Sequence, residues 1–213
     1  PSAFQMAGGL AIDQLDPTIL ELFLQYGADP NEQYTSSRQS MRTSGLSKWN
    51  LLHMVVENRD LHCAELLLRA GADVDAVKES HYVNERGYNT DSDKTPLHIA
   101  CHLGDLPMIQ NLIRFGANVN AVCRDLENVP KKNYVCYTDD PRSKGYVSPV
   151  RNVLVNQTPL HIVLKKKRRN VSAIARALIE AGANINTPYR YGRKSTPVEA
   201  LCLPGQYTAI FPV

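Results

Sequence analysis

The chain has 213 residues, of which 43% are hydrophobic and 21% are charged, as is ordinary for a globular protein. This length allows one domain with a sizeable core or a run of small stacked units, and no apolar run approaches the roughly 18 residues that span a bilayer. The net charge of +3 hides an asymmetry: residues 1–93 hold 7 Lys and Arg against 14 Asp and Glu, whereas residues 94–213 hold 17 against 7. The two halves therefore present opposite potentials, which bear on partner choice and encounter rate rather than on fold.

The cysteines and the N-terminus bear on the compartment. The cysteines are Cys63, Cys101, Cys123, Cys136 and Cys202. An odd number without tight spacing or a secretory signal favours reduced thiols inside a cell, in the cytoplasm or alternatively the nucleus. No second ligand pair accompanies Cys123 and Cys136 at metal-site spacing, so we expect neither a disulfide nor a metal there. Because Pro1–Phe4 lack Met and a signal-peptide pattern, we interpret the chain as cut or processed from a longer protein.

The first predicted helix follows Asp16-Pro17, a pair typical of a helix start, and ends at a glycine. Four glycines along the chain each precede Ala and then Asp or Asn. They are Gly27, Gly71, Gly116 and Gly182. Glycine just past a helix permits the left-handed conformation that ends it. Counting back from each glycine, positions −8, −7, −4 and −3 are apolar, which predicts one buried stripe at helical spacing.

Each of the last three glycines is preceded by a similar opening, in which Leu and His stand at the third and fourth positions. The openings are Asn50–His53, Thr95–Ala100 and Thr158–Ile162. Thr caps helix N-termini, and Pro suits the first helical position because its missing N–H would be unpaired there. A fourth opening, Thr196–Ala200, begins a last partial unit.

Thr-Pro-Leu-His-Ile-Ala at Thr95–Ala100, together with the four Gly-Ala-Asp/Asn endings, resembles the ankyrin-repeat family over about residues 12–203. The resemblance implies an all-α solenoid of helix–turn–helix units joined by β-hairpin fingers, in which each unit packs only on its neighbours. We expect one domain, 1–213, of about five repeats. Their approximate bounds are 6–31, 50–76, 95–121, 158–187 and 196–213. The first lacks a recognisable opening, and the last ends at Leu203 before a second helix.

Most of the extra length of these repeats falls after the glycines. The glycines are 44, 45 and 66 residues apart, against about 33 in the family. The resemblance therefore implies three long fingers, at 32–48, 77–94 and 122–157, and a shorter one at 188–195. In the fourth repeat, three extra residues fall between the two helices, at Lys165–Arg169.

The fingers are rich in tyrosine and also hold arginine. The eight tyrosines are Tyr34, Tyr82, Tyr88, Tyr134, Tyr137, Tyr146, Tyr189 and Tyr191, out of ten in the chain. Tyr and Arg combine broad contact area with directional polar groups and are common in interface hot spots, so we predict that the fingers bind a partner. The alternative is that the fingers pack on one another, with each ring covering the next hairpin.

Histidines recur without any sign of catalysis. His53, His98 and His161 occupy the same repeat position, so they stand one repeat apart and cannot converge on one ion. In the family this His hydrogen-bonds backbone in the neighbouring hairpin. His62, His81 and His102 have no acid or nucleophile at a meaningful spacing, and no Gly-rich phosphate loop is present. We therefore expect no enzyme activity, no catalytic residues and no cofactor.

Three interpretations of the cation run Lys165-Lys166-Lys167-Arg168-Arg169 stay open. The run could form a solvated turn, act as a nuclear-import signal, or bind nucleic acid or acidic surfaces. No aromatics are interleaved with these cations, as single-strand binding would require, so we do not expect a nucleic-acid partner.

The resemblance also implies which residues line a partner-binding groove, at the position before each opening and at the seventh and eighth positions after it. These are Trp49, Glu57, Asn58, Lys94, His102, Leu103, Gln157, Lys165 and Lys166. Trp49, the only Trp, is the strongest hot-spot candidate, unless it fills a gap left by its irregular opening. Asn31, Asn120 and Asn186 match a hairpin asparagine that is hydroxylated in some ankyrin proteins.

The sequence thus predicts a non-catalytic protein-interaction module, monomeric and not inserted in a membrane, that binds another protein or peptide through groove and fingers. One alternative is a regulatory or substrate-recruiting domain of a larger enzyme, such as a ubiquitin ligase, or of a channel. Another is a binder of nucleic acid or acidic surfaces through the basic C-terminal half, whose affinity would fall steeply with salt.

Overall fold

In the computed structural model, the described residues are 16–39, 43–84, 89–130, 150–166 and 169–188. They form seven helices and six strands. The helices are α2 (Pro17–Gln25), α3 (Leu51–Glu57), α4 (Leu61–Arg69), α5 (Pro96–Leu103), α6 (Leu106–Arg114), α7 (Pro159–Leu164) and α8 (Val171–Glu180). The strands are β1 (Gln33–Gln39), β2 (Thr43–Asn50), β3 (Lys78–Asn84), β4 (Asn89–Lys94), β5 (Cys123–Pro130) and β6 (Val150–Gln157). The start of the first predicted repeat, before residue 16, and the predicted opening at Thr196–Ala200 lie outside these ranges.

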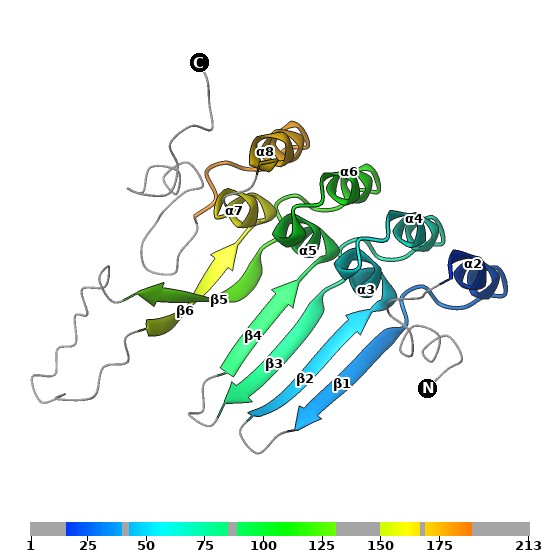
Figure 1. The fold of residues 1–213 in the computed structure, drawn as a ribbon, viewed down its shortest axis with the longest axis horizontal. Helices are drawn as coiled ribbons and strands as arrows, with labels where there is room; N and C mark the ends of the chain where they lie inside the picture. Colours follow the sequence, from blue (N-terminus) through cyan, green and yellow to red (C-terminus); the bar gives the residue numbers. More distant parts are fainter. Residues whose placement is uncertain (1–15, 40–42, 85–88, 131–149, 167–168, 189–213) are drawn as a thin grey trace, which may run out of the picture.

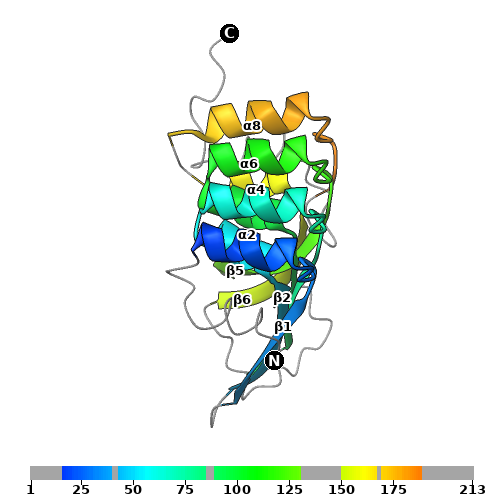
Figure 2. The same cartoon turned by 90° about the vertical axis from the view of Figure 1, so that its right-hand side faces the viewer.

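The helices stand in two rows (Figure 1). An inner row of α3, α5 and α7 lies beside the strands, and an outer row of α2, α4, α6 and α8 lies behind it. Figure 2 shows the outer helices stacked one on the next. The fully buried side chains come from both rows, among them Leu52, Leu67, Leu97, Leu112 and Leu178. Most of the apolar stripe predicted at helical spacing is thus the core between successive helix pairs. The prediction of burial is wrong for Ile19 on α2 and Ile179 on α8, which are 47% and 44% exposed.

Side-chain oxygens cap the N-termini of α2, α3, α4 and α6. Asn50 Oδ1 accepts a hydrogen bond from the His53 amide at 3.2 Å, which caps α3. The turn aspartates do the same for the outer helices: Asp60 Oδ1 accepts from Cys63 N at 3.0 Å, and Asp105 Oδ1 from Met108 N at 3.2 Å. The four predicted helix-ending glycines all have left-handed backbones, with φ between 86° and 92°.

The strands form more sheet than an all-α class implies, and that part of the predicted class is corrected. β1, β2, β3 and β4 form one antiparallel sheet in that order, and β5 pairs with β6 in a second. The link between successive hairpins is the β2–β3 pairing, in which Ser47 lies opposite Ser80 and Lys48 opposite Glu79. β4 lies next to β5, and Arg124 Nε donates to Asp93 Oδ2 at 2.6 Å across that boundary. Edge-to-edge pairing satisfies backbone groups that separate hairpins would leave to water.

A ladder of side-chain amides and carboxylates joins successive units at the helix-to-hairpin turns. Asn31 Nδ2 donates to the Gly71 carbonyl at 3.1 Å, and Asn31 Oδ1 accepts from Asp73 N at 2.7 Å. At the next step Asp75 Oδ1 accepts from Asn118 N at 2.9 Å. Asn120 repeats both bonds of Asn31 two steps further, to the Gly182 carbonyl at 3.0 Å and from Asn184 N at 2.7 Å. Each bond ties one turn to the next, so neighbouring units are held in fixed relation.

The turn between α7 and α8 is longer than the turns in the two preceding pairs. α7 ends at Leu164 and α8 begins at Val171, whereas two residues separate α5 from α6. The longer turn starts with Lys165 and Lys166, where the sequence placed the extra residues of this repeat.

Candidate functional site

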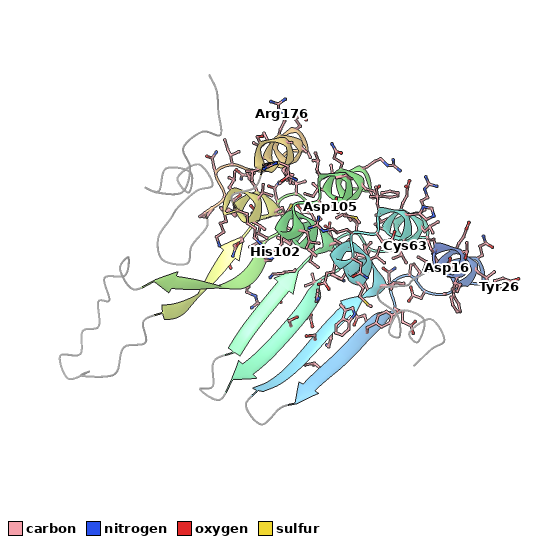
Figure 3. The ribbon with its side chains drawn as sticks, viewed as in Figure 1. Asp16, Tyr26, Cys63, His102, Asp105 and Arg176 are labelled. Carbon is pink, nitrogen blue, oxygen red and sulfur yellow. The ribbon has the colours of Figure 1, made fainter. Side chains whose placement is uncertain are left out.

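The candidate site lies where the inner helices meet the strands. We define the inner surface as the side of α3, α5 and α7 that faces the strands, together with the strand ends that lead into these helices. Figure 3 shows His102 on the side of α5 that faces the strands, and Arg176 on the opposite, outer side of α8. Most predicted groove positions that the structure describes fall on this inner surface.

A tryptophan, a lysine and a glutamate meet at the α3 end of the inner surface. Trp49 is half-buried against the core, and Lys78 Nζ lies 5.9 Å from the centre of its ring. The same ammonium donates to Glu57 Oε1 at 2.5 Å. A cation over an indole face is attracted by the ring quadrupole, and the carboxylate holds that cation in place. The cluster combines an aromatic face with a fixed charge pair.

Sequence reasoning missed Lys78, which stands outside the repeat positions that the resemblance implies for the groove. The signal that could have found it is hairpin register, since Lys48 pairs with Glu79 and Trp49 is therefore next to Lys78. Register between separate hairpins was not deducible from the sequence, because it depends on the fingers joining edge to edge.

Two predicted interface residues are buried instead. Tyr34 lies opposite Trp49 in the β1–β2 register and is only 7% exposed. Burial, with a smaller contribution from Glu32, raises the pKa of Tyr34 to about 12. For Tyr34 the alternative of a finger tyrosine packed on its own fold is therefore correct. Gln157 is buried as well, so it does not present a side chain to a partner.

The α5 and α7 end of the inner surface carries nitrogen bases and cations. Lys166 Nζ donates to His102 Nε2 at 3.0 Å, a bond that joins the ends of two inner helices and requires a lone pair on Nε2. Lys165 and Lys166 are half-buried, whereas His102 and Arg169 are exposed. Cations at the C-terminal end of α7 are also favoured by the helix dipole.

The repeated histidines hold the hairpins. His53 Nε2 lies 3.0 Å from the Ala76 carbonyl, and His98 Nε2 lies 3.1 Å from the Ala121 carbonyl, each 23 residues further on. The predicted structural role is confirmed for these two histidines. Burial is the main cause that lowers the pKa of His53 and His161 to about 4.

The cysteines among the described residues are buried and form no disulfide with one another: Cys63, Cys101 and Cys123. Burial raises the pKa of Cys63 to about 12. No group of three or more His, Cys, Asp or Glu side chains in the described part of the chain is arranged to hold a metal ion. Cys136 lies outside that part, so the expectation for its pair with Cys123 stays a prediction.

Several predicted site residues lie outside the described residues or are described only in backbone. Tyr82 belongs to β3, where it pairs with Gly45 and Thr90. The residues outside the description are Tyr88, Tyr134, Tyr137, Tyr146, Lys167, Arg168, Tyr189 and Tyr191. Within the described ranges, each helix is too short or too polar to cross a bilayer.

Helix pairs stacked in two rows, joined along the chain by hairpin strands that extend to one side, define a repeat solenoid. The sequence pattern of three ankyrin repeats matches residues 9–123, and that of a single ankyrin repeat matches residues 156–189. The chain belongs to the ankyrin-repeat family, as the resemblance of its motifs implies. Ankyrin repeats generally mediate protein–protein interaction and are typically non-catalytic.

Two relatives of known name share part of this sequence. Rabankyrin-5 of Mus musculus is 37% identical over 71 residues, and Rabankyrin-5 of Homo sapiens is 35% identical over 71 residues. Each match covers 33% of this chain and 6% of the relative. The similarity therefore concerns a short stretch of a much longer protein.

Proposed function

We propose that this chain is a non-catalytic interaction module that binds a segment of another protein across its inner surface. The observation that carries the proposal is the cluster of Trp49, Lys78 and Glu57. Trp in a partly desolvated site beside a fixed charge pair is typical of interface hot spots. An apolar side chain from the partner, seated on Trp49, would bury the remaining ring surface and exclude water from the ion pair.

The scaffold under this cluster favours binding without rearrangement. Hydrogen bonds from Asn31 and Asn120 tie the turns of successive units, and β1 to β4 tie the hairpins. A surface held rigid before binding loses little conformational entropy when a partner is seated on it. We propose that finger tyrosines outside the described residues, including Tyr134, Tyr137 and Tyr146, also contact the partner.

The proposal includes the organisation of the chain. We propose about five repeats in one domain with three long fingers, acting as a monomer in the cytoplasm or the nucleus. Three helix pairs and the single helix α2 support four of the repeats. The fifth rests on the opening at Thr196–Ala200 alone.

Two other functions compete with this proposal. In the first, the domain is a regulatory or substrate-recruiting arm of a larger enzyme or channel, and the same inner surface would then hold the substrate. In the second, the basic half binds nucleic acid or acidic surfaces. Lys165 and Lys166 support the second function, and steep salt dependence would distinguish it from the first.

The test is affinity capture from lysate with the parent chain and two variants. Trp49→Ala removes the ring on the inner surface, whereas Tyr26→Ala removes a ring that is 83% exposed at the end of α2 and serves as the matched control. We expect a partner that the parent and Tyr26→Ala retain and that Trp49→Ala loses, with circular dichroism showing all three folded. Equal retention by both variants contradicts the proposal.

A further inference from the structure

One repeat position changes its charge along the inner surface. The seventh residue after each helix opening is Glu57 in the first complete unit, His102 in the next and Lys165 in the third. The eighth residue follows the same trend, from Asn58 through Leu103 to Lys166. A segment lying across α3, α5 and α7 therefore meets a carboxylate, then an imidazole, then two ammonium groups.

Charges are matched at the α3 end. Glu57 is bonded to Lys78, and Lys48 Nζ lies 3.7 Å from Glu79 Oε2. Each cation named there has a carboxylate within ion-pair distance. A partner of either charge gains little from the electrostatic field at this end, so the contact it makes with Trp49 is decided by apolar area.

Cations exceed carboxylates at the α5 and α7 end. Among the side chains that the structure describes there, Asp93 is bonded to Arg124, and Asp105 is engaged in capping α6. Three further cations lie at this end: Lys94, Lys165 and Lys166. The bond from Lys166 to His102 holds the Lys166 ammonium of the α7 end against α5. Anionic side chains are attracted to such a surface and steered by it.

We infer that this cationic end takes an acidic stretch of the protein segment whose apolar side chain is seated on Trp49. The inference rests on the proposed function and specifies the chemistry of the partner. Neighbouring helices pack 8–10 Å apart, so α3 and α7 are separated by roughly 16–20 Å. An extended chain covers that span in about five or six residues. The partner motif is thus an aromatic or large aliphatic residue about five residues from a pair of acids.

The experiment uses the 213-residue chain and synthetic fluorescein-labelled peptides measured by fluorescence polarisation. The probe peptide places Phe about five residues from two Glu, and its control replaces both Glu by Lys. We expect the acidic probe to bind at least about tenfold more tightly than the Lys control, with affinity that falls as salt rises. Equal affinities, or no saturable binding of the acidic probe up to about 1 mM, overturn the inference.

Charge reversal locates the site. Lys165→Glu with Lys166→Glu places carboxylates at the end of α7, and Arg176→Glu reverses a charge on the outer side of α8 as a control (Figure 3). We expect the double variant to lose at least about tenfold in affinity for the acidic probe and the control to lose less than about twofold. If Trp49→Ala weakens binding and the double variant does not, the proposed function stands and this inference fails. A single-stranded oligonucleotide that binds more tightly than the probe, and is lost in the double variant, assigns the cations to nucleic acid instead.

Discussion

At the residue scale, buried polar side chains differ in whether their hydrogen-bonding groups have partners. His53 and His98 of the repeat openings are buried and bonded to hairpin backbone. Asn111 on α6 is only 9% exposed, and its Nδ2 has no hydrogen-bond partner among the residues that the structure describes. A buried amide without a partner loses its hydration and gains nothing in return.

Asn111→Leu is expected to raise the free energy of unfolding by about 1 kcal/mol, because it replaces an unpaired amide with an apolar group of similar shape. Leu66 occupies the equivalent position of the preceding unit. Urea unfolding followed by circular dichroism measures the change. Asn111→Ala is the control and should gain less, because it leaves a cavity. A destabilised Leu variant would show that the amide is paired in solution.

Stability should fall as pH is lowered from about 6.5 to about 4. The pKa of His53 and of His161 is about 4 in the folded state and near 6.5 when unfolded, so between these values the unfolded chain binds more protons. Each histidine then contributes a slope of at most about 1.4 kcal/mol per pH unit. His53→Gln should reduce the slope in urea titrations run at a series of pH values, and an unchanged slope would contradict this account.

At the element scale, the helix boundaries could be predicted from the sequence more fully than the pairing of the strands. The glycines that end the outer helices, the start of α2 at Asp16-Pro17 and most of the buried stripe were readable from the sequence, because Gly, Asp and Pro act within a few residues of where they stand. The caps Asp60 and Asp105 were not predicted. The joining of hairpins into a four-stranded sheet was not readable. It depends on register between segments such as β2 and β3, which polar strands like Lys78–Asn84 specify weakly.

Gly116→Ala is expected to lower the free energy of unfolding by about 1–2 kcal/mol. The backbone φ is 89°, and a Cβ there would meet nothing within 4 Å, so the cost comes from the left-handed conformation alone. Gly116→Asn should cost less, because Asn tolerates that conformation. Chemical denaturation of the two variants gives the comparison, and equal costs would point to a clash instead.

At the scale of the whole molecule, the sequence predicted the distribution of charge but not the contacts that the charged side chains make. The acidic and basic halves were visible in the sequence, and so were Trp49, Glu57, His102 and the two lysines as surface candidates. The role of Lys78 beside Trp49 and the bond from Lys166 to His102 became visible only once distant segments were placed together. The burial of Tyr34 has the same origin, since a tyrosine in a finger is exposed or buried according to what its hairpin pairs with.

Coupling between units is expected to depend on the ladder. Asn120→Ala removes a bond to the Gly182 carbonyl and one from Asn184 N, which connect the third unit to the fourth. Because a solenoid is stabilised by nearest-neighbour contacts, amide hydrogens of α7 and α8 should exchange faster while those of α3 and α4 change little. Faster exchange spread evenly over all helices would contradict this account.

Trp49 offers the most direct test of the central claim, that a protein partner is seated on the inner surface. The chain has a single Trp, so incorporation of fluorotryptophan gives one fluorine NMR signal. Titration with the captured partner is predicted to shift or broaden that signal in step with binding measured by calorimetry. Saturating binding with the signal unchanged would place the partner elsewhere and contradict the account.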